Sequence, residues 1–282
     1  MNELAIESNA IKATILPEIG GRLHRLQVFG HDLLRTPDDT ARHRDDPIFW
    51  GSYVMAPWCN RIEAAPLMVA GQRLNLIPNF PDGSIIHGQV FDRPWEQAGT
   101  GQLGCQGGGD GWPWQYEVAQ TIEVIDERLL IALSLTNLAD TAMPAGLGIH
   151  PWFVRPLEVR VPATSFYSPN SNTLAQPENV FGLHDLRRLQ PMPDDLDATW
   201  TGLTERMVEL RWPALGIGAE MHTDASQIVA ASPRHIDAVG LEPQTHAPQG
   251  IRRLLHNEPD AMTLLEPKSS LRLHVELVFS RF

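Results

Sequence analysis

Residues 271–279 read Leu271-Arg272-Leu273-His274-Val275-Glu276-Leu277-Val278-Phe279. Large apolar residues recur at every second position, and most of the residues between them are polar or charged. Side chains alternate between the two faces of a strand, whereas a helix would spread this pattern around its whole surface. The stretch therefore predicts a β-strand with one face in a hydrophobic core.

The same alternation occurs earlier in the chain, on both sides of a turn. Residues 116–124 and 129–135 each place apolar side chains at nearly every second position, and Asp126-Glu127 lies between them. Two alternating runs joined by a short polar turn are typical of a β-hairpin. Further short strands are expected at residues 5–6, 13–16, 23–28, 207–210, 217–221 and 228–230. No amphipathic helix longer than about two turns is expected.

Glycine and proline interrupt the chain throughout, with 22 Gly and 23 Pro among 282 residues. Many short alternating segments between such breaks predict an all-β fold, either a large antiparallel β-sandwich or a related barrel. All-β sandwiches often exceed about 200 residues as one unit, so we expect residues 1–282 to form a single domain. Residues 101–111 are expected to be a flexible loop, and residues 168–197 an irregular region that could border a binding site.

The composition argues against several partners. The formal net charge is −12, from 34 acidic and 22 basic residues, which disfavours nucleic acid and anionic membranes. Cys59 and Cys105 are too few for a disulfide framework and lack metal-ligand spacing. No stretch has the roughly 18 apolar residues of a membrane span, and the first residues lack the apolar core of a signal peptide. We therefore expect a cytoplasmic protein.

Two residues in unusual settings are candidates for proton transfer. His150 lies in Gly148-Ile149-His150-Pro151-Trp152-Phe153, and Glu242 lies in Gly240-Leu241-Glu242-Pro243. The proline after His150 favours an extended backbone, and the apolar neighbours of Glu242 predict burial, which raises the pKa of a carboxyl group towards the range of a useful base. The alternatives are a core histidine bonded to a backbone carbonyl and a buried glutamate paired with arginine.

Other residues are suited to binding an oxygen-rich ligand. Arginine and aspartate can hold hydroxyl groups, a histidine followed by glycine leaves room for a ligand, and indole rings pack on the C–H faces of sugars. Each could instead be structural, as an ion pair, a strand-end residue, a loop charge or a core tryptophan. The candidates are Asn60, Arg61, His87, Asp197, Trp58 and Trp152.

Taken in order, these segments resemble the aldose 1-epimerase family, also called mutarotases. The motifs that carry the resemblance are Asn60-Arg61-Ile62, Ile86-His87-Gly88, His150-Pro151-Trp152-Phe153, Leu196-Asp197 and Leu241-Glu242-Pro243. The similarity extends from Ile19-Gly20-Gly21-Arg22-Leu23 to Leu265-Glu266-Pro267-Lys268. The chain departs from the family pattern at Gln89 and at Val154-Arg155, which bears on sugar preference more than on the reaction.

The resemblance implies a large β-sandwich of the galactose mutarotase type that interconverts the α and β anomers of a free aldohexose such as galactose or glucose. It implies that His150 is the general acid and Glu242 the general base, and we expect nearby carboxylates to keep His150 protonated. The implied substrate-binding residues are Arg61, His87, Asp197, Asn60 and Trp152. No metal and no cofactor is implied. The expected partner is a monosaccharide, and the expected assembly is a monomer or a homodimer.

Several alternatives remain open. A hexose-6-phosphate 1-epimerase would need basic groups around a dianion, and the chain has 2 Lys but 20 Arg. Glycoside hydrolysis would use Glu242 and Asp197 as paired carboxylates. A non-catalytic sugar-binding protein would not need both an acid and a base. A histidine-ligated metal has the least support, because neither His-x-His nor Glu-x-x-His spacing occurs around His87 or His150. Gln89, Gln244 and Thr245 could discriminate between sugars at C4.

Overall fold

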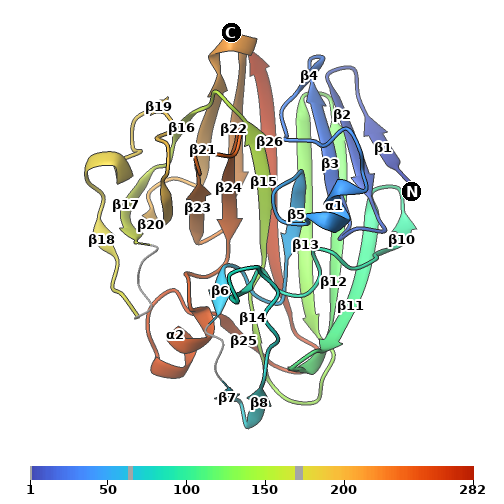
Figure 1. Ribbon diagram of the computed structural model, residues 1–282, viewed down its shortest axis with the longest axis vertical. Coiled ribbons are helices and arrows are strands. Elements are labelled where there is room, and N and C mark those ends of the chain that lie inside the picture. Colours follow the sequence, from blue (N-terminus) through green and yellow to red (C-terminus); the bar gives the residue numbers. More distant parts are fainter. Residues whose placement is uncertain (1, 63–65, 169–173) are drawn as a thin grey trace.

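Two large antiparallel sheets form most of the molecule (Figure 1). The structure is a computed structural model that describes residues 2–62, 66–168 and 174–282. The 11-stranded sheet contains, in spatial order, β1 (Leu4–Glu7), β2 (Ile11–Leu16), β3 (Arg22–Val28), β5 (Ser52–Met55), β15 (Gly148–Val154), β24 (Ala238–Gln244), β23 (Gln227–Ala231), β20 (Asp197–Leu203), β17 (Ala163–Tyr167) and β18 (Glu178–Asn179), and β4 (His31–Asp32) pairs with β3. The 9-stranded sheet contains β10 (Glu96–Gly99), β11 (Gln102–Gly109), β12 (Trp112–Ile125), β13 (Arg128–Asn137), β26 (Ser270–Arg281), β22 (Ile217–Thr223), β21 (Met207–Trp212), β16 (Glu158–Arg160) and β19 (Gln190–Pro191).

Small elements connect and cover the sheets. Three two-stranded pairs are β6 (Arg61–Ile62) with β9 (Ile85–Ile86), β7 (Leu67–Val69) with β8 (Gln72–Leu74), and β14 (Met143–Ala145) with β25 (Thr263–Leu265). The α-helices are α1 (Arg42–Asp45) and α2 (Gly250–His256), and 3₁₀ turns occur at Gly182–His184 and Pro213–Leu215. Across the described ranges, no helix has the length and apolar character needed to span a bilayer. The all-β fold predicted from the sequence is confirmed.

The clearest alternating segments form strands as predicted. Residues 271–279 lie within β26, and the predicted hairpin is β12 and β13, joined by a turn at Asp126 and Glu127. The prediction of a flexible loop at residues 101–111 is wrong, because β11 occupies most of it and pairs with β12. The region 168–197 contains β18 and β19, and residues 169–173 of it lie outside the described ranges.

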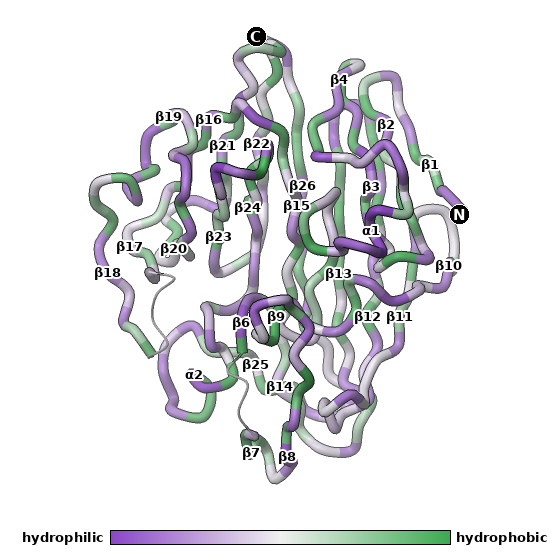
Figure 2. The backbone as a smooth tube through the Cα atoms, viewed as in Figure 1, coloured by the Kyte–Doolittle hydropathy of each residue, from purple (hydrophilic) through white to green (hydrophobic). Residues whose placement is uncertain are grey.

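The two large sheets pack against each other through one hydrophobic cluster. Ile149 and Phe153 of β15 belong to the same buried cluster as Met221 of β22 and Leu277 of β26, so side chains from both sheets share one interior. Figure 2 shows hydrophobic residues recurring along the strands of both sheets, whereas the surroundings of α1 are mainly hydrophilic. The molecule is therefore a β-sandwich, as the alternation along its strands predicts.

The opposite faces of β15 and β24 hold the polar residues that matter for function. Because side chains alternate along a strand, the residues next to Ile149 and Leu241 point away from the sandwich core. They meet a second apolar cluster, made up of Ile48, Tyr53, Met55, Cys59, Ile86, Phe91, Trp152, Ile236 and Ala238. Residues from the loops around α1 and β9 contribute to this cluster and cover that face. As a result both faces of β15 and β24 are buried, and polar side chains there are shielded from water.

Candidate active site

A pocket of about 370 Å³ lies on the covered face of the 11-stranded sheet. Its wall includes every catalytic and substrate-binding residue proposed from the sequence motifs, namely Asn60, Arg61, His87, His150, Trp152, Asp197 and Glu242. These residues come from segments up to about 180 positions apart in the chain, and β15, β24, β20 and the β6–β9 pair bring them together. A groove of about 440 Å³ on the 9-stranded sheet, where His274 pairs with Asp224, contains none of these seven residues.

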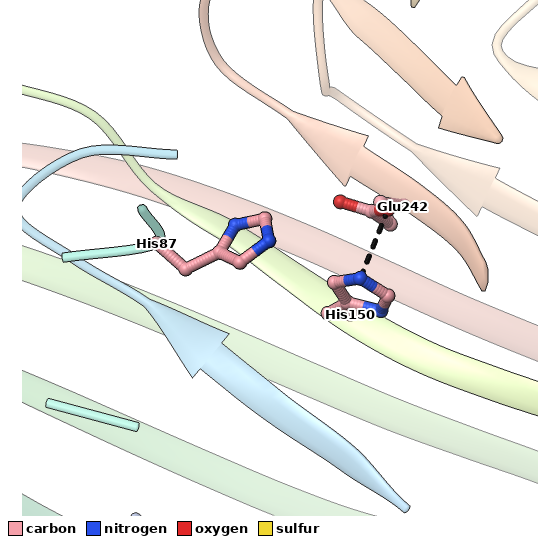
Figure 3. Close-up of side chains that lie close together, drawn as sticks. All are labelled: His87, His150 and Glu242. Atoms are coloured by element: carbon pink, nitrogen blue, oxygen red, sulfur yellow. Dashed lines mark ion pairs between the residues drawn. The ribbon is translucent and has the colours of Figure 1, made fainter. Parts of the chain in front are cut away.

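His150 and Glu242 face each other across neighbouring strands. Trp152 of β15 is in register with Gly240 of β24, and Gly148 is in register with Gln244, which places His150 opposite Glu242. The Nε2 atom of His150 lies 3.1 Å from Oε1 of Glu242 (Figure 3), and the two side chains are only 3% and 2% exposed. This distance permits direct proton transfer between the imidazole and the carboxyl group.

Aromatic rings hold the imidazole of His150 in place. Tyr53 is its cross-strand partner on β5, and the two rings stack with centroids 4.9 Å apart at an interplanar angle of 30°. Trp152, two residues along β15, lies 4.7 Å away at 32°. Gly240 leaves space for the ring, since a Cβ at that position would lie 2.8 Å from Cε1 of His150. The sheet register and these contacts restrict the imidazole to one orientation.

Burial shifts the pKa values of the pair in opposite directions. Burial raises the pKa of Glu242 to about 8, and the negative charge of Asp197 adds to the rise. Burial lowers the pKa of His150 well below its usual value, and His87 contributes further. The expectation that carboxylates keep His150 protonated is therefore wrong, because desolvation of the imidazolium outweighs their attraction. Near neutral pH the pair carries one proton, which burial places on Glu242.

His87 is held in a defined protonation state. Its backbone is in the left-handed region at φ 58°, and Nδ1 accepts a hydrogen bond of 3.3 Å from the backbone N–H of Asn60. Burial lowers the pKa of His87 to about 3. The ring is therefore neutral with its hydrogen on Nε2. Its centroid lies 5.2 Å from that of His150 in an edge-to-face arrangement, and Figure 3 shows both rings beside Glu242.

His87, His150 and Glu242 are close enough to be considered as a metal site. One potential ligand atom of each lies within 4.8 Å of the others. A histidine binds a metal through a ring nitrogen with a free lone pair. Because the Asn60 N–H occupies the lone pair of Nδ1 in His87, Nε2 bears the hydrogen and is a donor. The arrangement thus suits a hydrogen bond to a ligand oxygen better than it suits metal coordination.

Arg61 and Asp197 stand at the more open side of the pocket. The side chain of Arg61 is 44% exposed and lies 3.8 Å from Asp82 and 5.9 Å from the ring centroid of Phe80. Asp197 begins β20, and desolvation raises its pKa while the positive charge of Arg61 opposes the rise. The two residues offer a cationic donor and an anionic acceptor to polar groups of a ligand.

The pocket also has an apolar wall that the sequence motifs did not reveal. Phe49 packs 5.6 Å from Trp152 and 6.3 Å from Phe80, and all three residues line the pocket with Ile48. Phe49 and Phe80 belong to irregular connections, where no periodic pattern indicates which way a side chain points. Flat apolar surfaces of this kind pack well against the C–H face of a pyranose.

Several expected contacts with the ligand are wrong. Trp58 lies outside the pocket in the sandwich core, stacked on Trp112 at 5.2 Å. Gln89 bonds to the hydroxyl of Tyr116, and Thr245 accepts a hydrogen bond from the backbone of Leu147. Gln244 is fully buried behind Glu242. None of these four side chains lines the pocket, so they are not placed to discriminate between sugars at C4.

Comparisons with known proteins agree with this geometry. The aldose 1-epimerase family model matches residues 3–277. Among solved structures, an aldose epimerase homologue from C. elegans superposes with a TM-score of 0.84 at 19% identity, covering 99% of each chain. A galactose mutarotase-like protein from Clostridium acetobutylicum gives 0.82 at 15% identity, covering 99% of this chain and 95% of that one.

Galactose 1-epimerase from Lactobacillus acidophilus NCFM gives a TM-score of 0.78 at 15% identity, covering 99% of this chain and 94% of that one. At these identities the superpositions establish the fold. No curated protein matches the sequence significantly. The family model covers nearly the whole chain, including every motif that lines the pocket. The chain therefore belongs to the aldose 1-epimerase family and is an enzyme of the isomerase class.

Proposed function

We propose that the protein is a mutarotase that interconverts the α and β anomers of a free aldohexose, with galactose and glucose as the first candidates. The observation that carries this proposal is the contact of 3.1 Å between His150 and Glu242 in a pocket with polar and aromatic walls. Anomer exchange needs one group that removes a proton and one that supplies a proton. A protein that only binds a sugar has no use for such a pair.

In the proposed reaction, Glu242 serves the anomeric hydroxyl and His150 serves the ring oxygen. The carboxylate of Glu242 takes the proton from O1 while the imidazolium of His150 gives a proton to O5, and the C1–O5 bond breaks to leave the open-chain aldehyde. Rotation about C1–C2 then exposes the other face of the carbonyl group. Ring closure returns one proton from Glu242 to O1 and one from O5 to His150. The pair carries one proton throughout.

The protonation of the buried pair adds a step to this cycle. Burial places the single proton on Glu242, which is the state that complements the open-chain sugar. A cyclic sugar requires the carboxylate form, so the proton must move from Glu242 to His150 when the sugar binds. The contact of 3.1 Å provides the path for this transfer. Hydrogen bonds from the sugar hydroxyls to the carboxylate would favour it.

The charges around the pocket favour an uncharged sugar over a sugar phosphate. Besides Glu242, two carboxylates line the wall, those of Asp197 and of Asp195, which pairs with Arg234 at 3.2 Å. The lining cation Arg61 lies 3.8 Å from a further carboxylate, that of Asp82. A phosphate dianion would meet more negative than positive charge there. We therefore expect faster anomer exchange with glucose than with glucose 6-phosphate, and the reverse preference would favour the phosphate-specific alternative.

Polarimetry of freshly dissolved α-glucose and α-galactose tests the proposal. Glu242→Gln and His150→Asn should each lower the catalysed rate by roughly 10² to 10⁴, because each removes one positioned proton transfer. Asp224→Asn and His274→Asn are matched controls, because this histidine–carboxylate pair of 2.9 Å lies outside the pocket. Wild-type rates in both pocket variants would overturn the assignment of acid and base.

We further propose that the protein is cytoplasmic and that it takes part in hexose metabolism. The two cysteines, Cys59 and Cys105, are buried free thiols, which supports a reducing compartment. The single-domain organisation and the choice between monomer and homodimer stay predictions.

A further inference from the structure

Gln244 makes a direct contact with the proposed base from behind the pocket. It lies on β24 two residues after Glu242, on the same face of the strand, and it is fully buried. Its Nε2 donates a hydrogen bond of 2.7 Å to Oε2 of Glu242, while Oε1 of the same carboxyl group lies 3.1 Å from His150. The two carboxyl oxygens thus have different partners, an amide donor for Oε2 and the imidazole for Oε1.

This division restricts where a proton can sit on Glu242. An amide N–H that points at Oε2 favours a lone pair on that oxygen and disfavours a hydrogen there. The proton of the neutral carboxylic acid is therefore directed to Oε1, the oxygen that lies beside His150. We propose that Gln244 is a positioning residue for the proposed mutarotase reaction, which holds Oε2 of Glu242 and keeps the transferred proton on the oxygen that can exchange it with His150.

The neighbouring strand is consistent with this orientation of the amide. No described residue donates a hydrogen bond to Oε1 of Gln244, and none accepts one from Nε2 of Gln227. Gln227 is the register partner of Gln244 on β23. The strand register therefore pairs a residue whose amide oxygen lacks a donor with one whose amide N–H group lacks an acceptor. In the carboxylate form of Glu242, a reversed amide would place two oxygens next to each other and would lose the hydrogen bond to Oε2.

Other titratable groups also act on Glu242, so the test must isolate the amide. The groups that interact with its charge are His87, His150, Asp197, Arg61, Tyr53 and Cys59. Replacing Gln244 by methionine leaves all of these groups in place. The new side chain has a similar length but cannot donate the hydrogen bond to Glu242. The hydrogen bond to Gln244 lowers the pKa of Glu242, so its loss should raise that pKa further.

Two readouts separate a positioning role from a merely structural one. A hydrogen bond to a charged group changes an equilibrium by roughly ten- to a hundredfold, so Gln244→Met should lower kcat by about that factor. KM should stay unchanged, because Gln244 does not line the pocket. The decline of activity on the alkaline side should move to higher pH. Gln120→Met is the matched control. Gln120 is a buried glutamine of the 9-stranded sheet, and the substitution removes its hydrogen bond of 2.7 Å to the backbone carbonyl of Gly21.

A direct titration keeps this inference distinct from the proposed function. Carbon-13 NMR of the glutamate carboxyl groups, with Glu242→Gln for assignment, follows Glu242 without any substrate. We expect its titration near pH 8 in wild type and in Gln120→Met, and at higher pH in Gln244→Met. If Gln244→Met does not fold, Gln244→Asn, whose amide is one methylene shorter, should shift the titration in the same direction.

An unshifted titration in folded Gln244→Met, or equal kcat losses in Gln244→Met and Gln120→Met, would overturn the role of Gln244. A higher titration in Gln244→Met than in wild type, together with no anomer exchange by wild type, would support the contact and overturn the proposed reaction.

Discussion

Gly240→Ala should displace the imidazole of His150, the proposed acid, without changing a residue that lines the pocket. A Cβ at this position would lie 2.8 Å from Cε1 of His150 and 3.4 Å from both Nδ1 of His150 and Oε1 of Glu242. Carbon atoms pack at about 3.5 Å or more, so the overlap with the imidazole is roughly 0.7 Å. The ring has little room to retreat, because the rings of Tyr53 and Trp152 have their centroids 4.9 and 4.7 Å from its own. Displacements approaching 1 Å cost about a hundredfold in rate, so kcat should fall roughly ten- to a hundredfold.

The assay is polarimetry at saturating sugar together with a urea titration. Overpacking should lower the free energy of unfolding by about 1–3 kcal/mol, which leaves a folded protein to assay. Gly218→Ala is the matched control, because it also lies within a strand and its Cβ would meet nothing closer than 3.4 Å. Wild-type kcat in Gly240→Ala would refute the packing argument, and an equal loss in Gly218→Ala would show that the effect is not local to His150.

Three further predictions follow from charge and burial. The catalysed rate of anomer exchange should fall above about pH 8. Glu242 has a pKa of about 8, so above this pH the pair of His150 and Glu242 loses its only proton. A catalysed rate that keeps rising between about pH 8 and pH 10 would contradict this. Asp197→Asn should move that decline to lower pH, opposite to Gln244→Met, since it removes a negative charge that raises the pKa of Glu242. It should also raise KM. An unmoved decline would argue against the electrostatic coupling of Asp197 to Glu242. Arg22→Met should lower the free energy of unfolding by about 2–4 kcal/mol in urea, because buried Arg22 donates to the carbonyls of Trp50 and Phe91; a loss under about 1 kcal/mol would contradict this.

The fold was predictable from alternation, except where glycine hides it. β26 and the β12–β13 hairpin carry apolar side chains at every second position, which indicates both strand and face. β11 does not stand out in the sequence, because its glycines are typical of a flexible loop. In the structure Gly107 lies opposite Tyr116, and a Cβ there would be 2.1 Å from the tyrosine ring. The glycine makes room for a cross-strand aromatic ring, and only the strand register reveals that.

The members of the site were easier to predict than their protonation. Motifs with histidine or glutamate among apolar and turn residues indicated a pocket, and the structure brings all seven residues to one wall. Their roles stay predictions. The predicted positive charge of His150 is wrong, because its protonation depends on how completely the loops around α1 and β9 cover the strand. Sequence neighbours do not report such coverage by distant segments.

Contacts set by strand register could not be predicted from the chain alone. Tyr53 stacks on His150 because β5 and β15 pair with these two residues opposite each other. Trp58 lies close in sequence to Arg61, yet it points into the sandwich core. Gly240, by contrast, carried a readable signal, because a glycine inside an apolar strand often marks a close approach. That signal becomes specific only when the facing residue is known.

Exchange between anomers at equilibrium tests the central claim most directly. Saturation of the α H1 resonance of galactose or glucose should transfer to the β H1 resonance in the presence of wild-type protein, and the transfer should be lost with Glu242→Gln. Methyl glycosides should show no transfer with any variant, because they have no anomeric hydroxyl proton to remove. Transfer with wild type alone and only for the free sugar is the predicted result. Equal transfer in wild type and Glu242→Gln would contradict the account.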